Sequence, residues 1–228
     1  MTQGIFVTGT DTGVGKTLVA TALLRALVAD GARAVGMKPV AAGIEPDAAV
    51  SADVEAILAA GNVDASLSDV NPYSFASAIA PHLAAAKDGV AIDLDVIAAS
   101  YGRLVTCADI VVVEGAGGVL VPLCGCADML DVPARLGIPV VLVVGMRLGC
   151  INHALLSALA INARGLRLAG WVANRIDPAM RDIDANVAAL ALRLPAPLAV
   201  DIAWRADGAP PLRLHRASLR ALDLGRDA

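Results

Sequence analysis

The sequence predicts an α/β protein in which helices cover both faces of a mostly parallel β-sheet. Short apolar runs alternate along the 228 residues with longer segments of helical periodicity. The apolar runs are hydrophobic at nearly every position, which is typical of parallel strands buried on both faces. Aromatic residues make up only 3% of the chain and hydrophobic residues 57%, so the core must consist mainly of Ala, Val, Leu and Ile.

The first strand is expected at 5–7 and leads through a glycine-rich turn into a helix at 16–29. Further strands are expected at 34–37, 110–113, 140–144, 169–173 and 198–202, and further helices at 54–60, 94–105, 151–163 and 181–194. The Arg- and Leu-rich tail after Pro211 is compatible with a closing helix. No repeat, low-complexity tract or linker divides the chain, so we expect a single domain over residues 1–228.

Composition and charge exclude several classes of function. The mean hydropathy is high at +0.68, but apolar runs such as 138–144 are far shorter than the roughly 18 residues of a membrane-spanning helix. A formal net charge of −4 and the lack of a basic cluster with interleaved aromatics argue against nucleic acid as a partner. The chain shows neither a basic start nor an apolar leader, so we expect a cytoplasmic protein with reduced cysteines.

The glycine-rich turn from Gly9 to Thr17 reads Gly-Thr-Asp-Thr-Gly-Val-Gly-Lys-Thr. A strand before it and a helix after it are the setting of a phosphate-binding P-loop. Backbone N–H groups and the helix N-terminus would surround phosphate oxygens, Lys16 would reach the outer phosphates, and the Thr17 hydroxyl would bind Mg²⁺. Five residues separate Gly9 from Gly15, where the usual motif has four, so a glycine-rich turn without nucleotide is the alternative.

Three charged residues follow predicted strands or loops and are candidates for the same site. Glu114 ends the apolar strand at 110–113 and is either a second Mg²⁺ contact or a solvated cap. Lys38 ends the second strand and faces the P-loop if the first and third strands are neighbours; otherwise it is a solvated lysine. Asp53 opens a helix, and its spacing does not decide between a helix-terminal acid and a metal ligand.

The turn at 148–153 lies between an apolar strand and a helix. Free N–H groups at the helix start would suit an anion such as a carboxylate, and a start capped by a side chain is the alternative. Cys124 and Cys126 form half of a metal site or are simply small buried side chains, because no second pair stands at zinc-finger spacing. The three histidines have no Ser or Cys partner at a recognisable spacing, which argues against a catalytic triad.

Seven stretches, in this order, resemble the dethiobiotin synthetase family. They run from the N-terminus to about Trp204, and their order is far more specific than any one of them. The stretches are Gly9–Thr17, Lys38-Pro39-Val40, Asn71-Pro72-Tyr73, Pro81-His82, Val113-Glu114-Gly115-Ala116-Gly117-Gly118, Leu148-Gly149-Cys150-Ile151-Asn152-His153 and Ala169-Gly170-Trp171-Val172-Ala173-Asn174.

The resemblance implies a single P-loop NTPase-type domain and a reaction that uses ATP and Mg²⁺. The substrate 7,8-diaminononanoate would react with CO₂ or bicarbonate to a carbamate, which ATP phosphorylates before the second amine closes the cyclic urea. It also implies a homodimer with the substrate site at the interface, acting without nucleic acid or membrane. The enzyme class would be a cyclo-ligase that forms C–N bonds in biotin biosynthesis.

The resemblance also assigns roles to residues of this sequence. The catalytic residues would be Lys38, Lys16 and Thr12, and the Mg²⁺ ligands would be Thr17, Asp53 and Glu114. The nucleotide would contact Gly13, Val14, Gly15, Lys16, Thr17, Leu18, Asp53, Glu114, Gly115, Ala116, Gly117, Asn174, Arg175, Ala203, Trp204 and Arg205, with adenine at Asn174. The substrate would contact Lys38, Ala42, Gly118, Gly149, Cys150, Ile151 and Asn152.

Three positions depart from the family pattern. Gly13 stands where a relative carries Glu, and Ala42 replaces a serine that contacts substrate, at a cost of about 0.5–1.5 kcal/mol for a neutral hydrogen bond. Ala203 replaces a proline before Trp204, which puts the nucleotide contacts of that segment in question.

Two rival interpretations differ in function. A ParA/MinD-like ATPase switch would share the fold, but its signature lysine would stand five residues before the P-loop lysine, where this chain has Asp11. An amidotransferase of corrinoid synthesis would need an additional glutamine-hydrolysing domain, for which the chain has no room. A non-catalytic nucleotide-binding module is the third alternative, and Lys38 with Glu114 argues against it.

Overall fold

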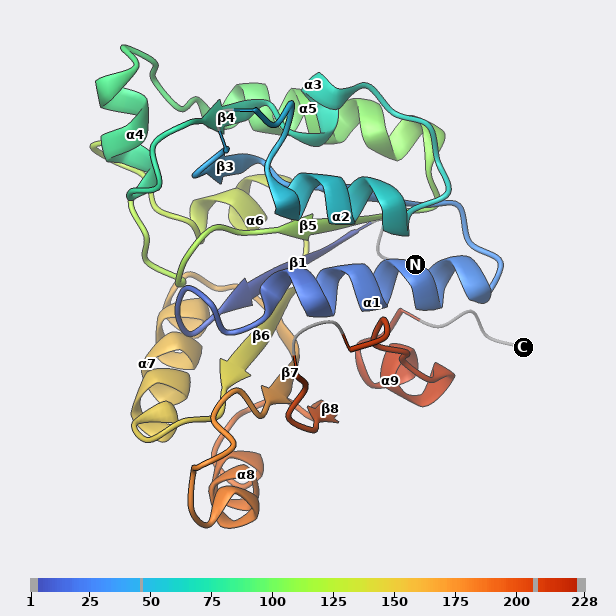
Figure 1. Ribbon diagram of the computed structural model, residues 1–228, viewed down its shortest axis with the longest axis vertical. Helices are drawn as coiled ribbons and strands as arrows, with labels where there is room; N and C mark the ends of the chain where they lie inside the picture. The colour runs from blue at the N-terminus through green and yellow to red at the C-terminus, as the bar shows by residue number, and fades with distance from the viewer. Residues whose placement is uncertain (1–3, 46, 207–208, 225–228) are drawn as a thin grey trace.

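The computed structural model describes residues 4–45, 47–206 and 209–224, which form an α/β fold (Figure 1). Its main sheet has six parallel strands in the order β2-β5-β1-β6-β7-β8. These strands are β1 (Gly4–Gly9), β2 (Ala34–Met37), β5 (Ile110–Glu114), β6 (Val140–Gly145), β7 (Leu168–Asn174) and β8 (Leu198–Ile202). The strands predicted from apolar runs are all confirmed, with ends that differ by at most two residues.

The helices cover both faces of this sheet, as the sequence predicts. They are α1 (Lys16–Ala29), α2 (Ala52–Ala60), α3 (Leu67–Val70), α4 (Pro81–Lys87), α5 (Leu94–Cys107), α6 (Asp131–Leu136), α7 (Cys150–Ala163), α8 (Ile183–Ala191) and α9 (Arg216–Ala221). Helix α1 lies along one face beside α2 (Figure 1), and its buried leucines form a core with Ile5 and Val7. Helices α5 and α7 bury Leu104 and Ile161 in a second core on the other face.

A small second sheet and three short helices of the structure were not predicted from the sequence. A small parallel sheet pairs β3 (Val40–Ala42) with β4 (Tyr73–Phe75), and short helices α3, α4 and α6 lie in the irregular regions. Such segments are too short to show a period of two or of 3.6 residues. Helix α2 also begins two residues earlier than predicted, because Ser51 caps it by accepting a hydrogen bond from Val54 N.

The order of the strands brings the candidate residues together. Strand β1 lies between β5 and β6, so the first and third strands predicted from the sequence, β1 and β5, are neighbours, as the interpretation of Lys38 required. Carboxyl ends of parallel strands share one edge, which here carries the turn after Gly9, Lys38 one residue beyond β2, Glu114 and Asn174. Within the described residues no helix is long and apolar enough to cross a membrane.

Gly36 in β2 offers a test of how tightly α1 and α2 pack on the sheet. A Cβ atom at Gly36 would lie 2.0 Å from Ile57 Cγ2 and 3.0 Å from Leu24 Cδ1, both of which are buried. We expect Gly36→Ala to lower the free energy of unfolding by about 1–3 kcal/mol through overpacking, as measured by urea denaturation. The control is Gly102→Ala in α5, where a Cβ meets open space and should stabilise by about 0.5–1 kcal/mol. Equal stability of Gly36→Ala and the original protein would contradict this packing.

Candidate active site

The P-loop passes from the end of β1 into α1 through two glycines with positive φ. Gly13 has φ 73° and Gly15 has φ 94°, a backbone region that other residues rarely adopt. Gly15 also has no room for a side chain, because a Cβ there would lie 2.3 Å from Asn174 Nδ2. No side-chain hydrogen bond caps α1 in the described structure, so its first N–H groups remain available to an anion.

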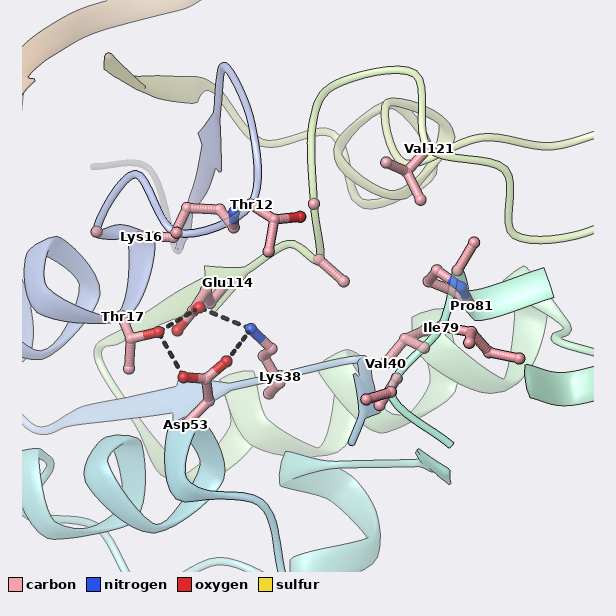
Figure 2. Close-up of a pocket in the computed structure, with 17 residues that line it drawn as sticks. Thr12, Lys16, Thr17, Lys38, Val40, Asp53, Ile79, Pro81, Glu114 and Val121 are labelled. Carbon is pink, nitrogen blue, oxygen red and sulfur yellow. Dashed lines mark hydrogen bonds and ion pairs between the residues drawn. The ribbon is translucent and has the colours of Figure 1, made fainter. Parts of the chain in front are cut away.

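A cluster of polar side chains lies directly beside the start of α1 (Figure 2). The Thr17 hydroxyl lies 2.7 Å from Asp53 Oδ1 and 2.8 Å from Glu114 Oε1. Since the hydroxyl has one proton, it can donate to only one of these carboxylate oxygens at a time. The carboxylate of Asp53 comes from α2, that of Glu114 from the end of β5 and the hydroxyl of Thr17 from α1, so three separate elements meet here.

Lys38 neutralises this cluster from the adjacent strand. Its Nζ lies 2.6 Å from Glu114 Oε1, 2.8 Å from Asp53 Oδ2 and 3.3 Å from the Gly115 carbonyl oxygen. Burial acts to lower the pKa of Lys38, but the carboxylates of Glu114 and Asp53 outweigh it and the pKa is raised. Lys38 is only 4% exposed, so it is a buried ammonium rather than the solvated lysine of the alternative interpretation.

The oxygen atoms of this cluster show whether it is suited to bind a divalent cation. Glu114 is fully buried, yet its Oε2 has no hydrogen-bond partner within the described residues. Two carboxylates and a hydroxyl around one point are the hard oxygen ligands that Mg²⁺ prefers. Among the described residues no group of three or more His, Cys, Asp or Glu side chains is placed to hold a metal ion, so a cation at this cluster would need further ligands from the nucleotide or water.

Lys16 is the first residue of α1 and lines the same cavity as Lys38. Its Nζ donates a 2.8 Å hydrogen bond to the Asp11 carbonyl oxygen, which curls the loop around its side chain. Burial, together with the positive charge of Lys38, lowers the pKa of Lys16 to about 8. Glu114, Asp53 and Asp11 act to raise this pKa, but burial outweighs them, and the ammonium lines the cavity where it would meet an incoming anion.

A cavity of about 710 Å³ joins the P-loop to an apolar wall. Its polar side carries Lys16, Thr17 and Lys38 (Figure 2). The opposite side is apolar, and the residues that form it were not among those predicted from the sequence: Val40, Ile79, Pro81 and Val121. The cavity can thus hold a phosphate group at one end and a hydrocarbon segment at the other.

Most predicted residues of the P-loop and the turn after β5 line this cavity. Those of the predicted set that do are Thr12, Gly13, Gly15, Lys16, Thr17, Lys38, Ala42, Asp53, Glu114, Ala116 and Gly117. Ala42 presents no hydroxyl to it, consistent with the departure noted in the sequence. Val14 is buried below the loop, Leu18 is half-buried on α1, and Gly115 and Gly118 follow β5 without lining the cavity.

Asn174 reaches the P-loop from the end of β7. Its Nδ2 donates a 2.8 Å hydrogen bond to the Val14 carbonyl oxygen, and its side chain is buried. Arg175 points instead to two carboxylates, at 2.7 Å from Asp201 and 2.6 Å from Asp184. The structure thus places Asn174, but not the Arg175 guanidinium, against the phosphate-binding loop.

The segment after β8 is separate from this cavity. Ala203, Trp204 and Arg205 line a second hollow of about 340 Å³ together with residues from 212 to 218. Trp204 is 51% exposed there. Among the described residues the two hollows have no lining residue in common, so the predicted nucleotide contacts at 203–205 and at the P-loop line different hollows.

The turn before α7 also lies outside the main cavity. Gly149 has φ 95° and no side-chain hydrogen bond caps α7, as a backbone anion site would require. Cys150 is buried, Ile151 half-buried, and Asn152 exposed, and none of them lines the cavity. Arg147 connects this turn to the P-loop through a 2.5 Å ion pair with Asp11.

The amino-acid sequence of this chain is similar to those of known proteins over most of its length. A family described as AAA domain matches residues 3–211. The ATP-dependent dethiobiotin synthetase BioD of Nitrosospira multiformis is 55% identical over 198 residues, which cover 87% of each chain. That of Aromatoleum aromaticum is 52% identical over 217 residues, covering 94% of this chain and 96% of the relative. The chain belongs to the dethiobiotin synthetase family.

Solved structures place this dethiobiotin synthetase family member within a wider fold. The MinC:MinD cell division complex of Aquifex aeolicus aligns with a TM-score of 0.56 at 15% identity, covering 89% of this chain and 82% of that one. The signal recognition particle receptor FtsY of Elizabethkingia anophelis gives 0.51 at 16% identity, covering 98% and 65%. At such identities the likeness concerns the fold alone. The rival interpretation as a ParA/MinD-like switch is therefore supported only by a distant structural similarity.

The pKa of Lys16 predicts how nucleotide affinity depends on pH. Because this pKa is lowered to about 8, the ammonium that would meet the phosphates is lost as pH rises through that value. We expect ATP affinity, measured by calorimetry, to fall by up to about tenfold between about pH 7 and about pH 9. Lys16→Met should bind ATP weakly and without this dependence. An affinity of the original protein that stays constant over the range would remove Lys16 from the phosphate site.

Proposed function

We propose that this chain catalyses the ATP-dependent closure of 7,8-diaminononanoate and CO₂ to the cyclic urea dethiobiotin, a step of biotin biosynthesis. Family membership supports the reaction class, a ligase that forms C–N bonds. The observation that carries the proposal in this molecule is Lys38, which stands between the P-loop and the apolar wall of the cavity. A non-catalytic nucleotide-binding module would not need a buried ammonium between its phosphate-binding loop and an apolar wall.

The proposed reaction has three steps. An amine of the substrate adds to CO₂ and loses a proton, which gives a carbamate. A carbamate oxygen attacks the γ-phosphorus of ATP, which releases ADP and leaves a carbamic-phosphoric anhydride. The second amine then attacks the carbonyl carbon, phosphate departs, and the ring closes.

The residues of the cavity fit these steps through position and charge. Lys16 and Lys38 would flank the carbamate and the γ-phosphate, stabilising negative charge as it shifts between them. Thr12 on the P-loop would contact the substrate. The apolar wall would hold the hydrocarbon chain and keep water from the mixed anhydride.

We also propose that Thr17, Asp53 and Glu114 hold Mg²⁺ with the nucleotide. The convergence of their oxygens and the unpartnered Glu114 Oε2 support this ligand set. When bound, Mg²⁺ would neutralise charge on the phosphate oxygens. Asn174 would recognise adenine beside the P-loop, and the segment 203–205 would contribute further nucleotide contacts.

The carboxylate tail of the substrate would bind outside this chain's own cavity, at the turn 149–152 of a second copy. The exposed apolar residues around that turn support a homodimer interface on α7, because Leu148 is 93%, Leu156 57% and Leu159 64% exposed. A second copy on this face would bury them. The elongated substrate would then span the two chains.

Two further proposals concern the number of domains and the location of the protein. We propose that residues 1–228 form one domain, supported by two core clusters that share the strands of the main sheet. We further propose that the protein acts in the cytoplasm without nucleic acid or membrane, in line with its charge of −4.

The decisive experiment measures ADP release by the purified protein with Mg-ATP and bicarbonate, with and without 7,8-diaminononanoate. We expect release that depends on the diamine and a cyclic urea product identified by mass. Release that ignores the diamine would indicate an ATPase switch, and no release would leave a nucleotide-binding fold; either result would overturn the proposal.

Removal of the Lys38 ammonium should separate binding from turnover. We expect Lys38→Ala to bind ATP within a few-fold of the original protein and to lose about 10²–10³ of its turnover, since the charge acts on the developing transition state. Lys87→Ala is the matched control, because Lys87 is an exposed lysine bonded only to Ser77 Oγ among the described contacts. Normal turnover of Lys38→Ala would show that Lys38 does not act in the reaction.

Asp53 and Glu55 on α2 allow a paired test of the metal ligands. Asp53→Asn should raise the Mg²⁺ concentration for half-maximal activity by about tenfold or more, because an amide oxygen is a weaker ligand than a carboxylate. Glu55→Gln, two residues further along the helix and exposed, should leave it unchanged. Equal Mg²⁺ requirements in both variants would exclude Asp53 as a ligand.

The α7 face can be tested by placing charge at its centre. We expect Leu159→Glu to convert the dimer to a monomer in light scattering, since a dimer would bury the carboxylate without a partner. Leu192→Glu is the control, because Leu192 is 85% exposed at the end of α8. A dimer that persists in Leu159→Glu would place the interface elsewhere.

A further inference from the structure

A pair of cysteines lies on a hairpin outside the proposed active site. Cys124 Sγ and Cys126 Sγ are 3.6 Å apart, within the range of an S–H···S hydrogen bond. They occupy the tip of a turn that is closed by an antiparallel bridge between Pro122 and Asp128 and by a 2.9 Å hydrogen bond from Leu123 N to the Ala127 carbonyl oxygen.

The base of this hairpin is firmly held while its tip faces solvent. Asp128 forms a 2.5 Å ion pair with Arg164, the residue that follows α7, and accepts a 2.9 Å hydrogen bond from Leu130 N. Met129 N donates a 2.9 Å hydrogen bond to the Val121 carbonyl oxygen, while Met129 itself is buried. Cys126 is exposed and Cys124 half-buried, so a small molecule can reach both sulfurs, while hydrogen bonds and ion pairs hold the base of the turn.

The surroundings give the two thiols different reactivity. The backbone N–H of Cys126, the Cys126 thiol and the N–H of Ala127 all hydrogen-bond the Cys124 sulfur and lower its pKa. The pKa of Cys126 is raised because its thiol donates to Cys124. Cys124 is thus suited to attack and Cys126 to follow, which is the arrangement of a reactive thiol beside a resolving thiol.

The other two cysteines lack this arrangement. Cys150 is buried at the start of α7, and burial raises the pKa of its thiol. Cys107, at the end of α5, is half-buried and donates to the Leu104 carbonyl oxygen at 3.2 Å. Both serve as internal comparisons for the pair on the hairpin.

We propose that Cys124 and Cys126 form a redox site that exchanges with low-molecular-weight disulfides such as glutathione disulfide. The Cys124 thiolate attacks one sulfur of glutathione disulfide, forms a mixed disulfide and expels a glutathione thiolate, which takes up a proton. The Cys126 sulfur, after losing its proton, attacks Cys124 Sγ and expels the second glutathione. Two protein thiols and one disulfide thereby become one protein disulfide and two glutathione thiols.

The ring closed by this disulfide is small, because a single residue separates the two cysteines. Such a bond is strained, and strained exposed disulfides are the ones that are readily reduced again. The site would therefore be reduced under cytosolic conditions and oxidised only when the ratio of disulfide to thiol rises.

The test uses the full-length protein and glutathione disulfide as the probe, in a Cys107→Ser background. In this background residues 104–135 form a tryptic peptide whose cysteines are the pair alone. After incubation, acid quenching and alkylation of remaining thiols, we expect the peptide to lose two hydrogen atoms, escape alkylation and regain both thiols with dithiothreitol.

Two variants identify the order of attack. Cys126→Ser should stop at the mixed disulfide, with one glutathione on Cys124, and Cys124→Ser should react far more slowly. A peptide that keeps two alkylated thiols, a stable glutathione adduct on the unchanged pair, or a disulfide to Cys150 would each overturn the proposal. These readouts do not involve ATP or the diamine, so they are independent of the proposed function.

Discussion

The buried carboxylate of Glu114 is the constraint on which the active site depends. It is fully buried at the end of β5, where an isolated charge would cost several kcal/mol. Lys38 at 2.6 Å offsets this cost, and Asp53 and Thr17 complete the cluster. Because these four residues come from the ends of β2 and β5 and from α1 and α2, their contacts tie one edge of the sheet to the helices above it.

The parallel sheet positions the remaining groups around this cluster. The P-loop follows β1 in the centre of the sheet, and Asn174 from β7 supports it by a hydrogen bond to the Val14 carbonyl oxygen. Gly15 makes that contact possible, since any side chain there would collide with the Asn174 amide. The loop is therefore held from two sides, by charge near β5 and by close packing near β7.

The sequence predicts the elements with strong local signals and misses those that arise from distant contacts. Apolar runs locate all six strands of the main sheet, and the glycine-rich turn ending in Gly-Lys-Thr between a strand and a helix indicates the P-loop. The apolar cavity wall escapes prediction because Val40 lies in the three-residue strand β3 and Ile79 and Val121 lie in loops, and only the fold brings these short segments together. Trp204, which family resemblance assigns to the nucleotide, lines a second hollow together with residues from the C-terminal segment, and its contact with nucleotide stays a prediction.

The pairing of Lys38 with Glu114 also has an evolutionary consequence. The two positions are separated by 76 residues of sequence, yet their buried charges lie 2.6 Å apart, with Asp53 as a second carboxylate 2.8 Å from Lys38. Loss of the Lys38 ammonium leaves the Glu114 carboxylate buried without its cation, and loss of Glu114 leaves Lys38 with Asp53 alone, whereas a joint replacement by neutral residues removes both buried charges. Divergent descendants that lose the reaction should therefore change both positions together, and a chain that retains one should retain the other.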